Sequence, residues 1–174
     1  MMKIILPQTD EKIVREYFQN SFFHRQKRII KLRWNYLPCY LFELNFVSQK
    51  KQKRVFIICD ALKGKIRRIN WPQPYQLAPP EINSFRLDER DALHKVKEEV
   101  RWISFSSGLP LRKKYHLERI NCLGRVGYPF WLVYFKKKGK YNFSVFDALS
   151  GKKEDFFGRD IFLAYFGLER APTI

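Results

Sequence analysis

The chain has 174 residues, of which 34 are Lys or Arg and 17 are Asp or Glu, so its formal net charge is +17. Apolar residues make up 45% and aromatic residues 17% of the sequence, which excludes an intrinsically disordered chain. No apolar run approaches the roughly 20 residues that span a bilayer, and three widely spaced cysteines exclude a disulfide framework.

The N-terminal segment predicts a helix over residues 9–21. Thr9 is the expected N-cap, acidic residues follow it, and apolar residues recur at helical spacing. From Arg25 to Trp34 the period changes to two, which predicts a strand with one apolar and one mainly cationic face. The cationic face is expected to carry Arg25, Lys27, Ile29, Lys31 and Arg33, and the other face Gln26, Arg28, Ile30, Leu32 and Trp34.

Pro38 is expected to end this strand. Two further strands, over residues 39–47 and 54–60, predict an antiparallel hairpin with a basic tip. The run from Val55 to Ile58 is apolar on both faces of its strand. Its second face is therefore expected to be covered by the other half of the chain or by a partner.

Residues 71–87 contain four prolines and no sustained periodicity, so they form the expected linker, stiffened by proline. The second half then repeats the order of the first. Asp88 is the expected N-cap of a helix that ends before Gly108 and Pro110. Strands are expected over 113–126, 130–135 and 140–147, and a short helix over 161–167.

The two hairpins close with nearly the same sequence, Asp60-Ala61-Leu62-Lys63-Gly64-Lys65 and Asp147-Ala148-Leu149-Ser150-Gly151-Lys152. In each turn the Asp can accept backbone hydrogen bonds and the Gly can take a positive φ. A self-match half a chain apart indicates one unit used twice. The expected fold class is α+β, with two tandem, pseudo-symmetric α-β-β-β modules in which one helix packs on an antiparallel sheet. The expected domains are a first module over 1–70, the linker over 71–87 and a second module over 88–174.

This organisation resembles PepSY modules, whose sequences share a helix, then strands, then a closing Asp-Ala-x-x-Gly motif after a hairpin. The matching residues are the two Asp-Ala-Leu turns, each preceded by an aromatic strand that begins with Tyr and Pro. As two copies, the resemblance covers almost the whole chain. It implies a non-catalytic protein that interacts with proteins, since some PepSY modules look like protease inhibitors within propeptides. PepSY modules are usually exported or membrane-attached, whereas this chain shows no export signal and a large positive charge.

Few residues suggest catalysis or metal binding. Asp60 and Asp147 suggest a carboxylate pair, but turn capping explains each of them. The three histidines are far apart in sequence, and only His116 with Cys122 stays open as part of a zinc site, which needs at least three convergent ligands. Motifs for nucleotide binding, zinc proteases and serine hydrolases do not occur. We therefore expect no catalytic residue, cofactor or metal.

The remaining candidate site is electrostatic. Residues 1–70 carry a net charge of +11 and residues 88–174 one of +6. Basic side chains beside aromatic ones, such as Trp34, Tyr36 and Trp71, can hold phosphates while the rings stack on bases. The candidate nucleic-acid-binding residues are Arg25, Lys27, Arg28, Lys31, Arg33 and Lys53.

We expect a non-catalytic protein that binds nucleic acid by counterion release, with little sequence preference. An acidic protein is the other partner that such charge attracts, and a PepSY-like interaction or inhibitory module is the alternative function. The cations can also be a solvated sheet face, an interpretation that Lys136–Lys140 fits best as an exposed loop tip. Membrane-surface binding through residues 161–168 and an enzymatic role rank lower. Because the N-terminal apolar run is too short for a signal peptide, the cytoplasm is the expected location.

Overall fold

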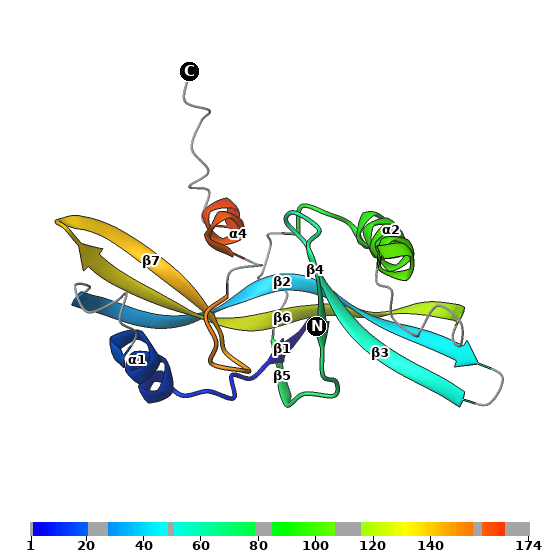
Figure 1. The fold of residues 1–174 in the computed structure, drawn as a ribbon, viewed down its shortest axis with the longest axis horizontal. Helices are drawn as coiled ribbons and strands as arrows, with labels where there is room; N and C mark the ends of the chain where they lie inside the picture. The colour runs from blue at the N-terminus through cyan, green and yellow to red at the C-terminus, as the bar shows by residue number, and fades with distance from the viewer. Residues whose placement is uncertain are drawn as a thin grey trace, which may run out of the picture. The chain divides into compact units, whose positions relative to one another are not determined.

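In the computed structural model the described residues are 2–20, 28–48, 51–78, 85–106, 116–154 and 158–165. Over these residues the protein is an α+β fold dominated by strands (Figure 1). The strands are β1 (Met2–Ile5), β2 (Arg28–Ser48), β3 (Lys51–Asp60), β4 (Ile66–Ile69), β5 (Tyr75–Ala78), β6 (His116–Lys137) and β7 (Lys140–Asp147). The helices are α1 (Glu11–Asn20), α2 (Glu89–Ser106) and α4 (Gly158–Tyr165).

The seven strands belong to one sheet with the order β4-β3-β2-β6-β1-β5, and β7 also pairs with β6. Both expected hairpins are confirmed. Strand β2 pairs antiparallel with β3, with Cys39 opposite Asp60, and β6 pairs antiparallel with β7, with Phe130 opposite Asp147. Three strands of four residues each, β1, β4 and β5, were not expected, because four residues are the shortest run in which alternation can be read.

Two expected boundaries are wrong. Strand β5 lies inside the predicted linker 71–87, so part of that segment belongs to the sheet; residues 79–84 lie outside the described residues. Pro38 does not end the first strand, since β2 runs through it and β6 likewise runs through Pro129. Proline cannot donate a ladder hydrogen bond, but both prolines still accept one: from the N–H of Ala61 at 2.9 Å and from that of Ala148 at 3.2 Å.

The chain forms two compact units. The first unit consists of Met1–Lys3 and Pro38–Gly127, and the second unit of Ile4–Leu37 and Tyr128–Ile174. Helix α2 thus belongs with the hairpin β2–β3 of the first half of the sequence, and α1 belongs with β6–β7. These units differ from the tandem modules expected over 1–70 and 88–174, because the two helices are exchanged between them.

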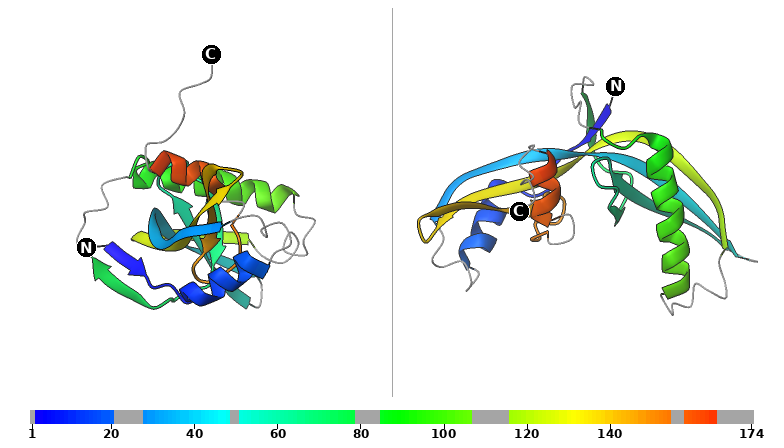
Figure 2. Two further views of the ribbon diagram at one scale, coloured as in Figure 1. Left: turned by 90° about the vertical axis from the view of Figure 1, so that its left-hand side faces the viewer. Right: turned by 90° about the horizontal axis from the view of Figure 1, so that it is seen from above.

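In the first unit, α2 lies beside strands β2 and β3 (Figure 2). Its buried residues Ala92 and Val96 are one helical turn apart, as an amphipathic helix requires. They share a core with Tyr40, Phe42, Leu44, Ile57 and Cys59. Alternate residues of a strand point to the same face, so these positions define the sheet face that α2 covers.

In the second unit, α1 buries Val14 and Phe18 completely. They pack with Trp131, Val133, Phe135 and Phe146. The ring centroids of Phe18 and Phe135 are 5.2 Å apart. Helix α4 lies on the opposite side of the strands (Figure 1), where Phe162 contacts Phe130 at 5.4 Å between centroids.

Asp60 organises the turn after β3 as the sequence predicted. Its buried carboxylate accepts hydrogen bonds from the backbone N–H groups of Leu62, Lys63 and Lys65. Gly64 follows at a φ of +74°, a conformation that residues with a Cβ rarely adopt.

Asp147 does the same after β7. It accepts hydrogen bonds from the N–H groups of Leu149 at 2.7 Å and Ser150 at 3.1 Å, and from the hydroxyl of Tyr128 at 3.0 Å. Gly151 has a φ of +69°, and a Cβ there would lie 3.1 Å from the methyl group of Thr9. Both predicted turns are therefore confirmed.

Each turn also holds the start of the helix in its own unit. The carbonyl oxygens of Ala61 and Ala148 each accept two backbone hydrogen bonds of 2.8–3.0 Å from the residues before that helix. The donors are Arg86 and Leu87 in the first unit, and Gln8 and Thr9 in the second. In each unit an aromatic side chain of the sheet also donates a hydrogen bond to these residues. Tyr40 Oη donates to the Leu87 carbonyl at 3.1 Å, and Trp131 Nε1 donates to the Thr9 carbonyl at 3.0 Å.

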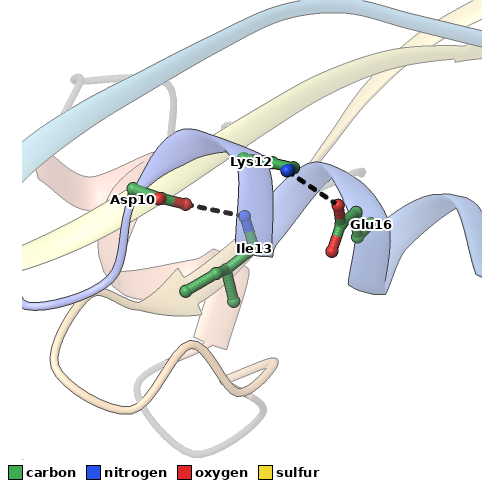
Figure 3. Close-up of polar contacts among 4 residues, drawn as sticks. All are labelled: Asp10, Lys12, Ile13 and Glu16. Carbon is green, nitrogen blue, oxygen red and sulfur yellow. Dashed lines mark hydrogen bonds and ion pairs between the residues drawn. The ribbon is translucent and has the colours of Figure 1, made fainter.

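The N-cap of α1 is Asp10, whose Oδ1 accepts a hydrogen bond from the N–H of Ile13 at 2.8 Å (Figure 3). The prediction of Thr9 as N-cap is wrong, because the Thr9 hydroxyl donates to the Ala148 carbonyl at 2.9 Å instead. The expected N-cap of α2 is confirmed, since Asp88 Oδ1 accepts from the N–H of Asp91 at 2.8 Å.

The exchange of helices can be tested by a double-mutant cycle on Phe18 and Phe135. We expect Phe18→Leu and Phe135→Leu to show a coupling of about 0.5–1.5 kcal/mol, because the two rings touch. The measurement is the free energy of unfolding in urea for both single variants and the double variant. The control pair is Phe18→Leu with Phe42→Leu, whose ring lies in the first unit, and this pair should be additive within about 0.5 kcal/mol. Coupling in the control pair alone would favour the contiguous modules.

Candidate nucleic-acid interface

Asp60 and Asp147 do not form a catalytic pair. They belong to different compact units, and each carboxylate is saturated by the hydrogen bonds of its own turn. Among the described residues, no buried side-chain nitrogen or oxygen lacks a hydrogen-bond partner. Both aspartates are therefore explained by their structural role.

The cysteines lack the features of nucleophiles. Burial raises the pKa of the Cys59 thiol to about 12 and raises that of Cys39 well above its usual value. Burial also raises the pKa of the half-buried Cys122. A thiol with a raised pKa keeps its proton at neutral pH, and only the thiolate is a good nucleophile.

No group of three His, Cys, Asp or Glu side chains within the described ranges is arranged to hold a metal ion. His24 lies outside these ranges. His94 pairs with Glu98 on the surface of α2 at 3.3 Å, and His116 is exposed at the start of β6.

The structure divides the predicted nucleic-acid-binding residues. Arg25 and Lys27 lie outside the described residues. Arg28, Lys31 and Arg33 are exposed on β2 in the second unit, whereas Lys53 is exposed on β3 in the first unit. The predicted residues are thus divided between the two units. Only Arg28, Lys31 and Arg33 lie on the same strand of the same unit.

Lys31 and Arg33 share the sheet face opposite α1. Leu32 and Trp34 pack into the core that contains α1, so the residues that alternate with them point away from that helix. The assignment of Ile29 to the cationic face is wrong: Ile29 packs on the same core. Ile30, expected to be apolar and inward, is 51% exposed, so the alternation is broken between residues 29 and 32.

Strands β6 and β7 extend this face with aromatic residues. Tyr134 lies opposite Phe143 across the hairpin, and Lys136 lies opposite Tyr141. The ring centroids of Tyr134 and Phe143 are 6.0 Å apart, and Lys136 Nζ lies 5.4 Å from the centre of the Tyr141 ring. Because Val133 and Phe135 point to α1, the residues between and beyond them point the other way.

We define the open face of the second unit as Lys31, Arg33, Tyr134, Lys136, Tyr141 and Phe143. Strand β2, which carries the first two, is the sheet neighbour of β6. Residues 28–37 and 128–146 of these strands contain no Asp or Glu. Lys31 and Arg33 make no ion pair with any described residue. The sequence missed the aromatic part, because Lys136–Lys140 was interpreted as a loop tip and Tyr141 was not paired with it.

The aromatic residues first expected beside the cations serve other roles. Trp34 belongs to the core under α1, with Tyr36 against it at 4.9 Å between centroids. Trp71 stacks on Tyr75 in the first unit at 6.2 Å, and Lys3 Nζ lies over both rings. That ring pair belongs to the first unit, whereas the cations of β2 belong to the second.

The corresponding face of the first unit is different. Glu43 follows Pro38 by the same interval at which Tyr134 follows Pro129, and it likewise points away from the helix. Its carboxylate lies 3.7 Å from the Arg54 guanidinium and accepts a hydrogen bond from Asn121 at 3.2 Å. The acid thus occupies the Arg54 cation of its own face, so we place the candidate site in the second unit.

Two surfaces that favoured other functions are covered. Ile57 and Ile58, in the strand that is apolar on both faces, are 6% and 0% exposed, so this hairpin offers no open apolar face there. The apolar residues Ile161 and Phe162 of α4 are buried as well. Of the described helices, none combines the length and the apolar character needed to cross a bilayer. Comparison with models of protein families, with curated proteins and with solved structures found no match.

The role of Asp147 can be tested by substitution. We expect Asp147→Ala to lower the free energy of unfolding by about 2–3 kcal/mol, because buried donors lose a charged acceptor. The measurement is urea denaturation at pH 7, with the exposed Asp10→Ala as the control, which should cost only about 1 kcal/mol as a lost N-cap. A destabilisation no larger than that of the control would contradict the structural role.

The thiol assignments predict a pH dependence. At pH 8 all three thiols should stay protonated in the folded protein and react with iodoacetamide much more slowly than free cysteine, whose pKa is about 8.5. Cys122 should react first as the pH rises, because it is the least buried. Mass spectrometry of the alkylated protein, with and without urea, gives the measurement. Fast labelling of Cys59 in the folded protein at pH 8 would show that its burial is wrong.

Proposed function

We propose that the protein is a non-catalytic nucleic-acid-binding protein and that the open face of the second unit is its binding surface. The proposal rests on one observation: Lys31 and Arg33 have no acidic partner among the described residues and lie beside a strand pair that carries the exposed ring of Tyr141. Cations without a partner are free to neutralise phosphates, whereas the paired Arg54 of the first unit must first leave Glu43.

Charge alone does not select the second unit. By sequence, its segments carry 15 basic and 8 acidic residues, and those of the first unit carry 19 and 9. Both units are positive, so both attract polyanions at long range. Placement decides between them: among the described residues, Lys31, Arg33 and the exposed ring of Tyr141 share one sheet face of the second unit. The strand segments that form this face contain no Asp or Glu.

Binding would be driven by counterion release and would depend little on sequence. Lys31 and Arg33 stand about 6.5–7 Å apart along β2, since alternate residues of a strand are separated by two rises. Lysine acts as a point charge and arginine can grip a phosphate with two N–H groups. Contacts of this kind fix position on a nucleic acid without reading base edges. A cytoplasmic location, as expected from the sequence, would give access to such ligands.

The alternative function is a PepSY-like protein interaction, in which an acidic protein occupies the same cations. Helix α1 favours it, because its apolar residues Ile13 and Tyr17 are 48% and 49% exposed. A protein partner would bury these apolar side chains, and a nucleic acid would leave them in water.

The test is the salt dependence of binding. We expect the full chain to bind a labelled oligonucleotide of mixed sequence, measured by fluorescence anisotropy, with an affinity that falls steeply between 50 and 200 mM salt, the range over which counterion release is marked. The double variant Lys31→Gln/Arg33→Gln should lower the salt slope by about 1.4–1.8 and the affinity at 0.1 M salt by about 10–30-fold, since each lost phosphate contact removes about 0.7–0.9 from the slope.

The matched control is Arg119→Gln, an exposed cation on β6 in the first unit, at the place that corresponds to Lys31. It should reduce affinity by less than about threefold, as a long-range charge does. Equal effects of control and test variants would move the site away from the open face. No binding at 50 mM salt, together with capture of an acidic protein that Ile13→Ser/Tyr17→Ser abolishes, would favour the alternative function.

A further inference from the structure

We infer that the ligand of the open face is a single-stranded nucleic acid whose bases stack on Tyr141 and on the Tyr134–Phe143 pair. This inference rests on the proposed function and adds the class of ligand. Phosphate contacts alone do not distinguish single strands from duplexes, so the argument comes from the aromatic residues.

Tyr141 is the most exposed large apolar or aromatic side chain in the described part of the protein, at 76% of its surface. So exposed a ring adds little to the core. It is the second residue of β7, and its pair with Lys136 is the last but one before the turn of the hairpin. Lys136 lies directly opposite, with its ammonium group over the ring. A ring beside a cation can take a base face and the adjoining phosphate together.

The Tyr134–Phe143 pair continues the surface along the same strands. Both rings are half-buried, and their planes are inclined by 41°. Phe143 follows Tyr141 by two residues on the same face of β7, about 6.5–7 Å along the strand. Two aromatic positions at this interval can hold successive bases of an extended strand.

The cations lie beside these rings rather than among them. Lys31 and Arg33 lie on β2, the neighbour of β6, whereas the rings lie on β6 and β7. A single strand can therefore run with its phosphates along β2 and its bases over the hairpin. A duplex hides its base faces in its own stack, so it would meet the cations but not the rings. For this reason the face fits a single strand.

The experiment measures the affinity of the full chain for four probes by anisotropy at 0.1 M salt. The probes are a 12-nucleotide DNA, the same sequence as RNA, a blunt duplex of that sequence, and a 12-residue abasic DNA. We expect the two single strands to bind at least about tenfold more tightly than the duplex and the abasic strand. DNA and RNA should bind alike, because base faces and phosphates are common to both.

Tyr141→Ala should weaken single-strand binding by about 5- to 100-fold, the range measured for the loss of one stacked base. It should change binding of the duplex and the abasic strand by less than twofold. Tyr141→Phe keeps the ring and should bind as the wild type does. Because the side chain is exposed, both variants should fold, and circular dichroism checks this.

The outcomes separate the two proposals. Equal binding of single strand, abasic strand and duplex, with no effect of Tyr141→Ala, would overturn the inference and leave the proposed function intact. Binding of none of the four probes would overturn both. A loss with Tyr141→Ala that is equal for all probes would show a role in folding or charge rather than in stacking, and would also overturn the inference.

Discussion

The rest of the structure depends on the hydrogen bonds that join the start of α1 and of α2 to an Asp-Ala turn. A single carbonyl group, that of Ala61 or Ala148, accepts two backbone hydrogen bonds from the residues before the helix. The preceding aspartate keeps that carbonyl in place, because its carboxylate binds the N–H groups of the following turn. Since the N-cap aspartate comes next in the chain, the turn sets where the helix begins and which sheet face it covers.

The hydrogen bonds that Ala148 accepts from the residues before α1 determine which sheet face α1 covers in the second unit. With α1 held at the turn after β7, Val14 and Phe18 cover one face of the sheet, and Leu32 and Trp34 must point to them. The alternation of β2 then turns Lys31 and Arg33 to the other face. Helix α4 covers part of that face near Phe130. The open face is thus a consequence of core packing on its reverse side.

Sequence patterns predicted most of the local structure. They failed where a contact joins residues that are far apart in the chain. Both hairpins, both Asp turns and the N-cap Asp88 follow from period, turn chemistry and capping, which neighbouring residues determine. Which hairpin each helix joins cannot be read this way, because both Asp-Ala turns offer the same carbonyl group. The same limit explains Thr9, which resembles an N-cap but is recruited by the distant Ala148. Pairing across β6 and β7 likewise extends β6 into the expected loop, so that Lys136 lies opposite Tyr141.

The comparison of the two units shows that charge counts alone do not distinguish their sheet faces. The first unit has the larger number of basic residues, but Glu43 lies on the sheet face opposite α2 and binds Arg54 and Asn121. In the second unit the corresponding position is Tyr134, and the residue that faces Lys136 across the hairpin is an exposed tyrosine. An ion pair must be broken before its cation can bind a phosphate, whereas a cation beside an aromatic ring keeps its charge available. The same backbone arrangement therefore supports a face with a bonded acid in one unit and a cationic face with aromatic rings in the other.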